Sequence, residues 1–142
     1  MLRTFGGHAP RVHACAFVHD SAEIIGRVAL GRGVSIWPMA VLRGDVNRIS
    51  VGENTNIQDH CVIHCREGFA AVIGRGVTVG HGVIVHGARI GQGCLIGMGA
   101  IIMESVIGAQ CLIAAGAMVP KGRRIPPRSL VMGFPAKVAR KL

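Results

Sequence analysis

The segments Val51–Asn56 (V-G-E-N-T-N) and Ile73–Thr78 (I-G-R-G-V-T) are two copies of one six-residue pattern, in which an aliphatic residue is followed by glycine. Within successive runs, the aliphatic residue recurs every six positions: Val18, Ile24, Leu30, Ile36, Leu42; Val51, Ile57, Ile63; Ile73, Val79, Val85; Ile90, Ile96, Ile102; Ile107, Ile113 and Val119. This period fits neither a helix of about 3.6 residues per turn nor an ordinary hairpin sheet. It is typical of hexapeptide β-helix repeats.

The repeat predicts an all-β fold, a parallel β-helix in which three hexads make one triangular coil. Aliphatic residues point inward and stack into a continuous core, and glycine suits the corners because it has no Cβ. We expect one domain over residues 1–142, with repeat coils over about 12–119 and a C-terminal return segment over 120–142. Prolines 126, 127 and 135 predict that this last segment lacks regular structure. Residues 1–11 show no repeat and predict a short leading strand over the first coil.

Two segments interrupt the hexads, Arg43–Ser50 (R-G-D-V-N-R-I-S) and Cys65–Ala71 (C-R-E-G-F-A-A). We expect both to be loops that leave the prism. Loops on a rigid scaffold often carry functional residues.

The net charge of +9 suggests anionic partners. Lysines and arginines concentrate only in Lys121–Lys141, and no aromatic residues interleave with them as a base-stacking surface requires. The composition therefore favours small anions over nucleic acid. No apolar run is long enough for a membrane span, so we expect no membrane partner.

Five cysteines occur without a C-x-x-C pair, and no signal peptide precedes them, which together favour a reducing cytoplasm. Cys61 and Cys65 flank His64, so a thiol ligand to a metal has to be weighed. The alternative, favoured here, is that the cysteines are small buried hydrophobes of the repeat core.

Arg43, His64 and His86 each follow an aliphatic repeat position in successive coils, so they should stack on one edge of the prism. Adjacent strands lie about 4.8 Å apart, which brings His64 and His86 within reach of one ion. Histidines on a repeat surface can equally be without function. The shared register of two of them, in line with Arg43, favours a site.

His81 follows Val79 by two residues, and Asp59 follows Ile57 by two, one coil below. His81 should therefore point from a different edge and not close the same site within one chain. A threefold trimer would bring it to the His64–His86 pair of a neighbour.

Three imidazoles suit Zn²⁺ at Zn–N distances of about 2.0–2.1 Å and leave a fourth position for water. Such bound water titrates near pH 7 and supplies hydroxide at neutral pH. Fe²⁺ or Co²⁺ would fit the same ligand type.

Five motifs together resemble the γ-class carbonic anhydrase family, and the resemblance runs through nearly the whole chain. They are Ser35–Asp45 (S-I-W-P-M-A-V-L-R-G-D), Asn56–Asp59 (N-I-Q-D), Val62–His64 (V-I-H), Thr78–Gly87 (T-V-G-H-G-V-I-V-H-G) and Gly133–Lys137 (G-F-P-A-K). The resemblance implies a left-handed β-helix, although parallel crossovers are in general right-handed. It also implies a homotrimer with metal sites at the subunit interfaces.

The resemblance further assigns roles to residues. It implies that His64 and His86 of one chain and His81 of the next are the metal ligands. Arg43 and Asp45 resemble the family's inter-subunit ion pair beside the site. In the same way, Gln58 and Asp59 resemble the polar residues that orient the bound water and the substrate.

Several departures from the family pattern predict weak or conditional turnover. Strongly active members carry an acidic loop whose glutamate shuttles protons, whereas Cys65–Ala71 is short and holds only Glu67. Val46 replaces a glutamate, and the chain contains no tyrosine. Relatives also add an α-helix after the G-x-P-A-K segment, and since this chain stops at Leu142 we expect that helix to be missing and some prism surface to be exposed.

Three functions are therefore considered. The first is reversible hydration of CO₂ to bicarbonate, a carbonate dehydratase activity. The second is acyl-CoA thioester hydrolysis or acyl transfer on the same scaffold, with the basic residues of Lys121–Lys141 holding phosphates. The third is a non-catalytic, metal-bearing trimer that binds a small ligand or assembles into a larger complex.

Overall fold

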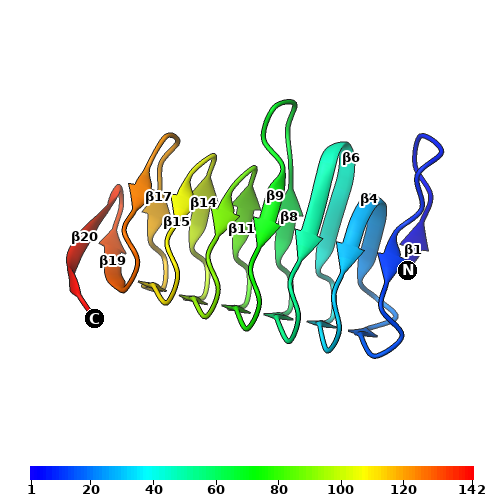
Figure 1. The fold of residues 1–142 in the computed structure, drawn as a ribbon, viewed down its shortest axis with the longest axis horizontal. Helices are drawn as coiled ribbons and strands as arrows, with labels where there is room; N and C mark the ends of the chain where they lie inside the picture. The colour runs from blue at the N-terminus through cyan, green and yellow to red at the C-terminus, as the bar shows by residue number, and fades with distance from the viewer.

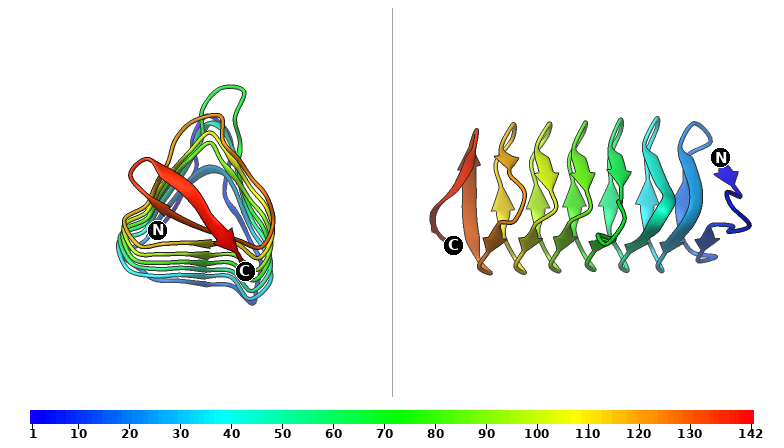
Figure 2. Two further views of the ribbon diagram at one scale, coloured as in Figure 1. Left: turned by 90° about the vertical axis from the view of Figure 1, so that its left-hand side faces the viewer. Right: turned by 90° about the horizontal axis from the view of Figure 1, so that it is seen from above.

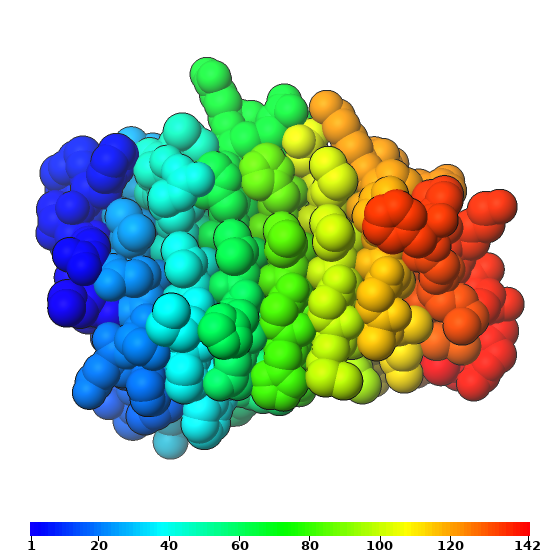
Figure 3. All heavy atoms as spheres, turned by 180° about the vertical axis from the view of Figure 1, so that it is seen from behind, coloured from blue at the N-terminus to red at the C-terminus, as the bar shows by residue number.

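The structure, a computed structural model, describes all of residues 1–142 and contains strands and turns but no helix. The chain winds into a three-sided prism whose coils stack from the N-terminal end to the C-terminal end (Figure 1; Figure 2, left). In Figure 3 each coil forms a band of one colour, and the bands lie side by side. The all-β parallel β-helix predicted from the hexads is confirmed.

Two sheets make the three faces of the prism. Face 1 is an eight-stranded sheet of β3 (Phe17–Val18), β5 (Ser35–Ile36), β7 (Asn56–Ile57), β10 (Thr78–Val79), β13 (Leu95–Ile96), β16 (Leu112–Ile113), β19 (Ser129–Gly133) and β20 (Ala136–Lys141). The other sheet has twelve strands and bends around one corner, so that it covers both remaining faces.

Face 2 comprises β1 (Leu2–Arg3), the first halves of β4 (Glu23–Leu30) and β6 (Val41–Val51), β8 (Val62–His64), β11 (Ile84–His86), β14 (Ile101–Met103) and β17 (Met118–Val119). Face 3 comprises β2 (Arg11–Val12), the second halves of β4 and β6, β9 (Ala71–Ile73), β12 (Arg89–Ile90), β15 (Val106–Ile107) and β18 (Arg124–Ile125). All pairings are parallel except that of β19 with β20.

The interior is one cluster of 34 buried residues, made almost wholly of aliphatic side chains. In the short strands one residue points inward while its neighbours point out, as in β8, where Ile63 is fully buried between Val62 and His64. Because every coil repeats this alternation, each inward residue packs on the equivalent residue of the next coil.

Glycine is required at the corners for two different reasons. A Cβ on Gly74 would lie 2.7 Å from the backbone nitrogen of Gln92 in the next coil, so only glycine permits that close approach. Gly76 has open space around it but a φ of +61°, a backbone conformation that residues with a side chain rarely adopt.

The segment Arg43–Ser50 does not leave the prism, and the prediction of a loop there was wrong. Strand β6 runs without a break from Val41 to Val51 around the corner, and β4 runs beside it. The corner can be this tight because Gly44 lies against the backbone of Arg27, where a Cβ would be 2.6 Å from the carbonyl oxygen. The other interruption does leave the prism: residues 65–70 form the tallest loop, between β8 and β9 (Figure 1).

The segment 120–142 is also more regular than predicted. Strand β18 pairs with β15, and β19 pairs with β16, so the coils continue to Val131. Strand β20 then turns back and pairs antiparallel with β19, which closes the C-terminal end. The prolines are tolerated because Pro126 and Pro127 lie at a corner between strands, where no ladder hydrogen bond is needed from their nitrogen atoms.

Candidate metal and catalytic site

The side chains of His64 and His86 stack on one edge of face 2. The two residues are paired in register between β8 and β11, and Arg43 pairs with His64 from β6, as predicted. The two imidazole rings lie with their centroids 5.2 Å apart and are tilted by 48°. Two imidazoles are therefore presented side by side by rigid strands rather than by a loop.

Asp45 connects this pair to Arg43. Its Oδ1 lies 2.8 Å from Nε2 of His64, and the Arg43 guanidinium donates a hydrogen bond to Oδ2. Burial acts to raise the pKa of Asp45. The hydrogen bonds from His64 and from the backbone amides of Val46 and Asp45, together with the Arg43 charge, outweigh it and lower that pKa to about 2. The carboxylate is thus charged at neutral pH.

Cys65 lies beside this carboxylate and imidazole. One ligand atom from each of Asp45, His64 and Cys65 falls within 4.8 Å of the others. The thiol is fully buried, and burial raises its pKa. Because only the thiolate is a strong metal ligand, this environment favours Cys65 as a core side chain, in line with the reading favoured from the sequence.

His81 lies at the opposite edge of face 2, in the turn between β10 and β11. Its Nδ1 is 3.0 Å from Oδ2 of Asp59, the residue one coil below, as the register predicted. This contact fixes the ring through Nδ1 and leaves Nε2 accessible, because the side chain is 53% exposed. Gln58 is half-buried next to Asp59 on the same edge.

Within one chain, the structure brings together Arg43, Asp45, His64 and His86 at one edge, and Gln58, Asp59 and His81 at the other. The strand β11 separates the two groups, since His81 precedes it and His86 ends it. His81 therefore does not join the His64–His86 pair of its own chain.

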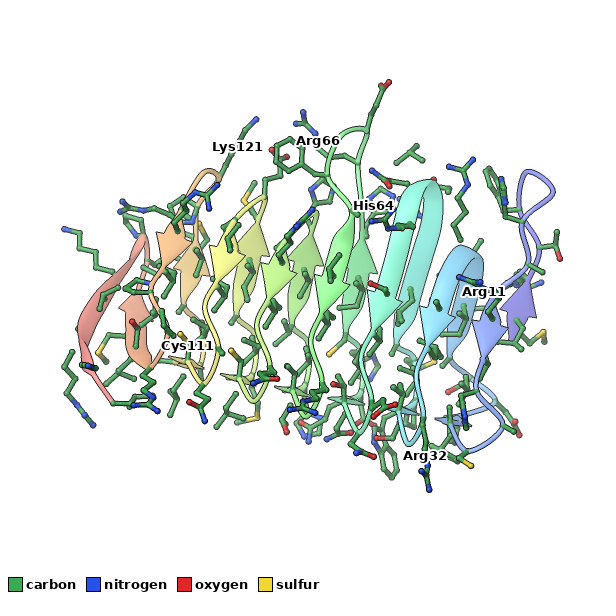
Figure 4. The ribbon with its side chains drawn as sticks, in the orientation of Figure 1. Arg11, Arg32, His64, Arg66, Cys111 and Lys121 are labelled. Carbon is green, nitrogen blue, oxygen red and sulfur yellow. The ribbon has the colours of Figure 1, made fainter.

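Glu104 is a site residue that the sequence reasoning missed. Its Oε1 lies 3.9 Å from Nδ1 of His86 and accepts a hydrogen bond from Arg66 at 3.1 Å, while Lys121 Nζ lies 3.1 Å from Oε2. These cations lower the pKa of Glu104, the Lys121 contact most of all. Figure 4 shows Arg66, Lys121 and His64 along the same edge of the prism.

A signal for Glu104 was present in the sequence. Glu104 and Lys121 each follow an aliphatic repeat position, Ile102 and Val119, by two residues. The same count that paired His81 with Asp59 would have placed Glu104 and Lys121 in adjacent coils at one corner.

Comparisons with known proteins bear on this site. A hexapeptide-repeat family model, "Bacterial transferase hexapeptide (six repeats)", matches residues 87–121. The chain is 48% identical over 126 residues to a "Probable carbonic anhydrase" of Methanocaldococcus jannaschii, an alignment covering 88% of this chain and 79% of that protein. The chain belongs to the γ-class carbonic anhydrase-like family of hexapeptide-repeat proteins.

Other proteins similar to this chain carry different descriptions, and the alignments cover different shares of them. The mitochondrial gamma carbonic anhydrase 1 of Arabidopsis thaliana is 48% identical over 85 residues, which cover 56% of this chain and 31% of that protein. A crystal structure described as a putative acetyltransferase from Bacillus cereus superposes with a TM-score of 0.98 at 39% identity, over 99% of this chain and 83% of that one. The structure contains no helix long and apolar enough to cross a membrane.

Proposed function

We propose that this protein is a metal-dependent carbonic anhydrase of the γ class, which catalyses the reversible hydration of CO₂ to bicarbonate. The observation that carries the proposal is the pair of in-register imidazoles, His64 and His86, at one edge of face 2, with His81 held by Asp59 at the other edge. The names and identities of the relatives support the same reaction.

The proposal requires a homotrimer in which His81 of one chain meets His64 and His86 of the next. Face 2 supports this because outward-facing apolar residues form a ladder between the two edges, one per coil. The ladder consists of Val41, Val62, Ile84, Ile101 and Met118. Val62 and Ile84 are each 40% exposed in the single chain. A second copy of this chain on that face would bury the ladder and bring opposite histidine edges together.

The donor set fits a metal ion of the zinc class. Two imidazoles stand on adjacent strands, and the Asp59 carboxylate holds the third through Nδ1, as carboxylates commonly do for histidines that bind metal ions. When bound, such an ion acts as a Lewis acid and makes water nucleophilic near neutral pH. Zn²⁺ is our first choice, and Fe²⁺ or Co²⁺ suits the same ligands.

The remaining residues of the chain position the reactants. Gln58 and Asp59, on the His81 edge, orient the attacking water and CO₂ through hydrogen bonds. Arg43 supplies a positive charge that favours the bicarbonate product, and Asp45 holds Arg43 and His64 in place. A carboxylate with a lowered pKa suits this holding role, because it stays charged throughout turnover.

We expect slow turnover because a proton acceptor is poorly placed. Glu67 is exposed at the tip of the loop over residues 65–70, and Val46 is an exposed apolar side chain near the site. Proton release would then depend on buffer in solution.

The test of the proposed function is CO₂ hydration by protein purified without oxygen and reloaded with Zn²⁺ or Fe²⁺, with His81→Ala as the control. Activity that needs both the metal and His81 supports the proposal. Bound metal without turnover contradicts it and favours a non-catalytic binding or assembly trimer.

A second candidate is acyl-CoA chemistry, as a thioesterase or acyltransferase. It is supported by the description of the Bacillus cereus structure as a putative acetyltransferase and by the exposed basic residues after Pro120, among them Arg123 and Lys137. Coenzyme A binding that survives chelation of the metal and is lost in Arg123→Gln/Lys137→Gln would favour this function. Absence of coenzyme A binding would remove it.

A further inference from the structure

A small hollow of about 330 Å³ lies on face 3 beneath the loop over residues 65–70, beside the site described above but on the other side of the corner. Its floor is Val106 of β15, flanked by Arg89 of β12 and Arg124 of β18 in direct register. Phe69 lines its wall. We refer to these four residues as the Arg89–Arg124 pocket.

The charged side chains of this pocket have no partner within the chain. Arg89 and Arg124 are exposed and form no ion pair or side-chain hydrogen bond within the chain, unlike Arg66, which is bound by Glu104. They stand two strand spacings apart, about 9–10 Å, on either side of an apolar floor. A carboxylate placed between them would accept hydrogen bonds from both guanidinium groups.

The neighbouring acid does not oppose an anion there. Glu104 also lines the hollow, but its carboxylate is already bound by Arg66 and Lys121 and faces His86. The charge presented by the hollow is therefore net positive. Phe69 and Val106 offer apolar surface, which a hydrated inorganic ion would not use.

We propose that the Arg89–Arg124 pocket binds a small organic carboxylate. Its carboxylate accepts hydrogen bonds from the two guanidinium groups, and its short apolar body lies on Val106 against Phe69. This binding is separate from the proposed hydration of CO₂, since it uses none of the residues assigned to that reaction.

Calorimetry on the full chain loaded with zinc tests the proposal, with butyrate as the probe, butyramide as its uncharged counterpart and inorganic phosphate as an anion without an apolar body. Butyrate should bind saturably and more tightly than either. Arg89→Gln and Arg124→Gln should each weaken butyrate binding by about tenfold. Arg32→Gln is the matched control, since Arg32 is exposed and equally without a partner at another corner of the prism (Figure 4).

One further readout separates this site from the proposed hydration of CO₂. His81→Ala should keep full butyrate binding, so failure of the hydration proposal would leave this one standing. Equal binding of butyrate and butyramide, tighter binding of phosphate, or equal affinities for Arg89→Gln, Arg124→Gln and Arg32→Gln would each overturn the proposal.

Discussion

The Nε2 atom of His64 lies 2.8 Å from Oδ1 of Asp45, whose other oxygen accepts a hydrogen bond from Arg43. Residues from two adjacent strands are thus locked together at the edge where the candidate metal ligands stand. The carboxylate held between them contributes to the stability of the fold.

Asp45→Asn should remove a pH-dependent part of the stability. The pKa of Asp45 in the folded chain, about 2, lies below its ordinary value of 3.8, so the contribution is present above pH 3.8 and is lost as the pH falls toward 2. We expect about 1 kcal/mol after screening by solvent. Urea unfolding of the wild type and Asp45→Asn at pH 7 and at pH 2.5 measures it. The expectation would be contradicted if the free energy of unfolding differed between the wild type and Asp45→Asn by the same amount at pH 7 and at pH 2.5.

Ile84→Glu should dissociate the proposed trimer without unfolding the chain. Ile84 stands in the outward apolar ladder of face 2 and is 40% exposed in the single chain, so a charge there is hydrated in the monomer but buried in the trimer. Sedimentation equilibrium should show at least about a tenfold loss of association. Leu95→Glu is the matched control because Leu95 is 45% exposed on face 1. A trimer that survives Ile84→Glu, or falls apart equally with Leu95→Glu, would place the interface elsewhere.

Gly74→Ala and Gly76→Ala should destabilise the coil by different amounts. A Cβ at Gly74 meets backbone of the next coil, which cannot move alone, so we expect a loss of about 2–4 kcal/mol. At Gly76 the space is open and only the positive φ is unfavourable, which costs about 1–2 kcal/mol. Denaturant unfolding of the two variants gives the order. A larger loss for Gly76→Ala would mean that close stacking of coils is not the dominant constraint.

Only one of the five cysteines should react with a thiol reagent in the native protein. Cys15 is exposed, whereas Cys61, Cys65, Cys94 and Cys111 are buried. Burial also raises the pKa of Cys61 and of Cys94 to about 11, so few thiolates are present at pH 8. Titration with Ellman's reagent should modify one thiol in the wild type and none in Cys15→Ser. Rapid modification of a second thiol would show that the core opens.

Much of the fold follows from the hexads, because each inward aliphatic residue packs on its equivalent in the next coil. The stacking of His64 on His86 follows from the same count. The corner at Arg43–Ser50 could not be predicted from spacing, since it depends on Gly44 contacting the backbone of Arg27 in another strand. The coil after Val119 could have been predicted, because Ile125 and Val131 are buried and continue the six-residue spacing. The neighbouring prolines led instead to the prediction of irregular structure.

The candidate site was only partly accessible from the sequence. The register predicted that His81 lies beside Asp59 and away from His86. The spacing within a single chain cannot predict which residues of another chain His81 meets. Glu104 was missed because its three partners come from a loop, a strand and a turn, and only His86 had been recognised as part of the site.

In the proposed trimer each site combines His64 and His86 of one chain with His81 of another, and mixing two inactive variants tests this arrangement. His64→Ala and His81→Ala, each inactive alone, are unfolded together in equal amounts, refolded and loaded with zinc. A trans-subunit site predicts that three-quarters of the trimers are mixed and that each contains one intact site, which restores about one quarter of wild-type CO₂ hydration. No activity in the refolded mixture, beside a wild-type sample that regains its own, would contradict the shared site.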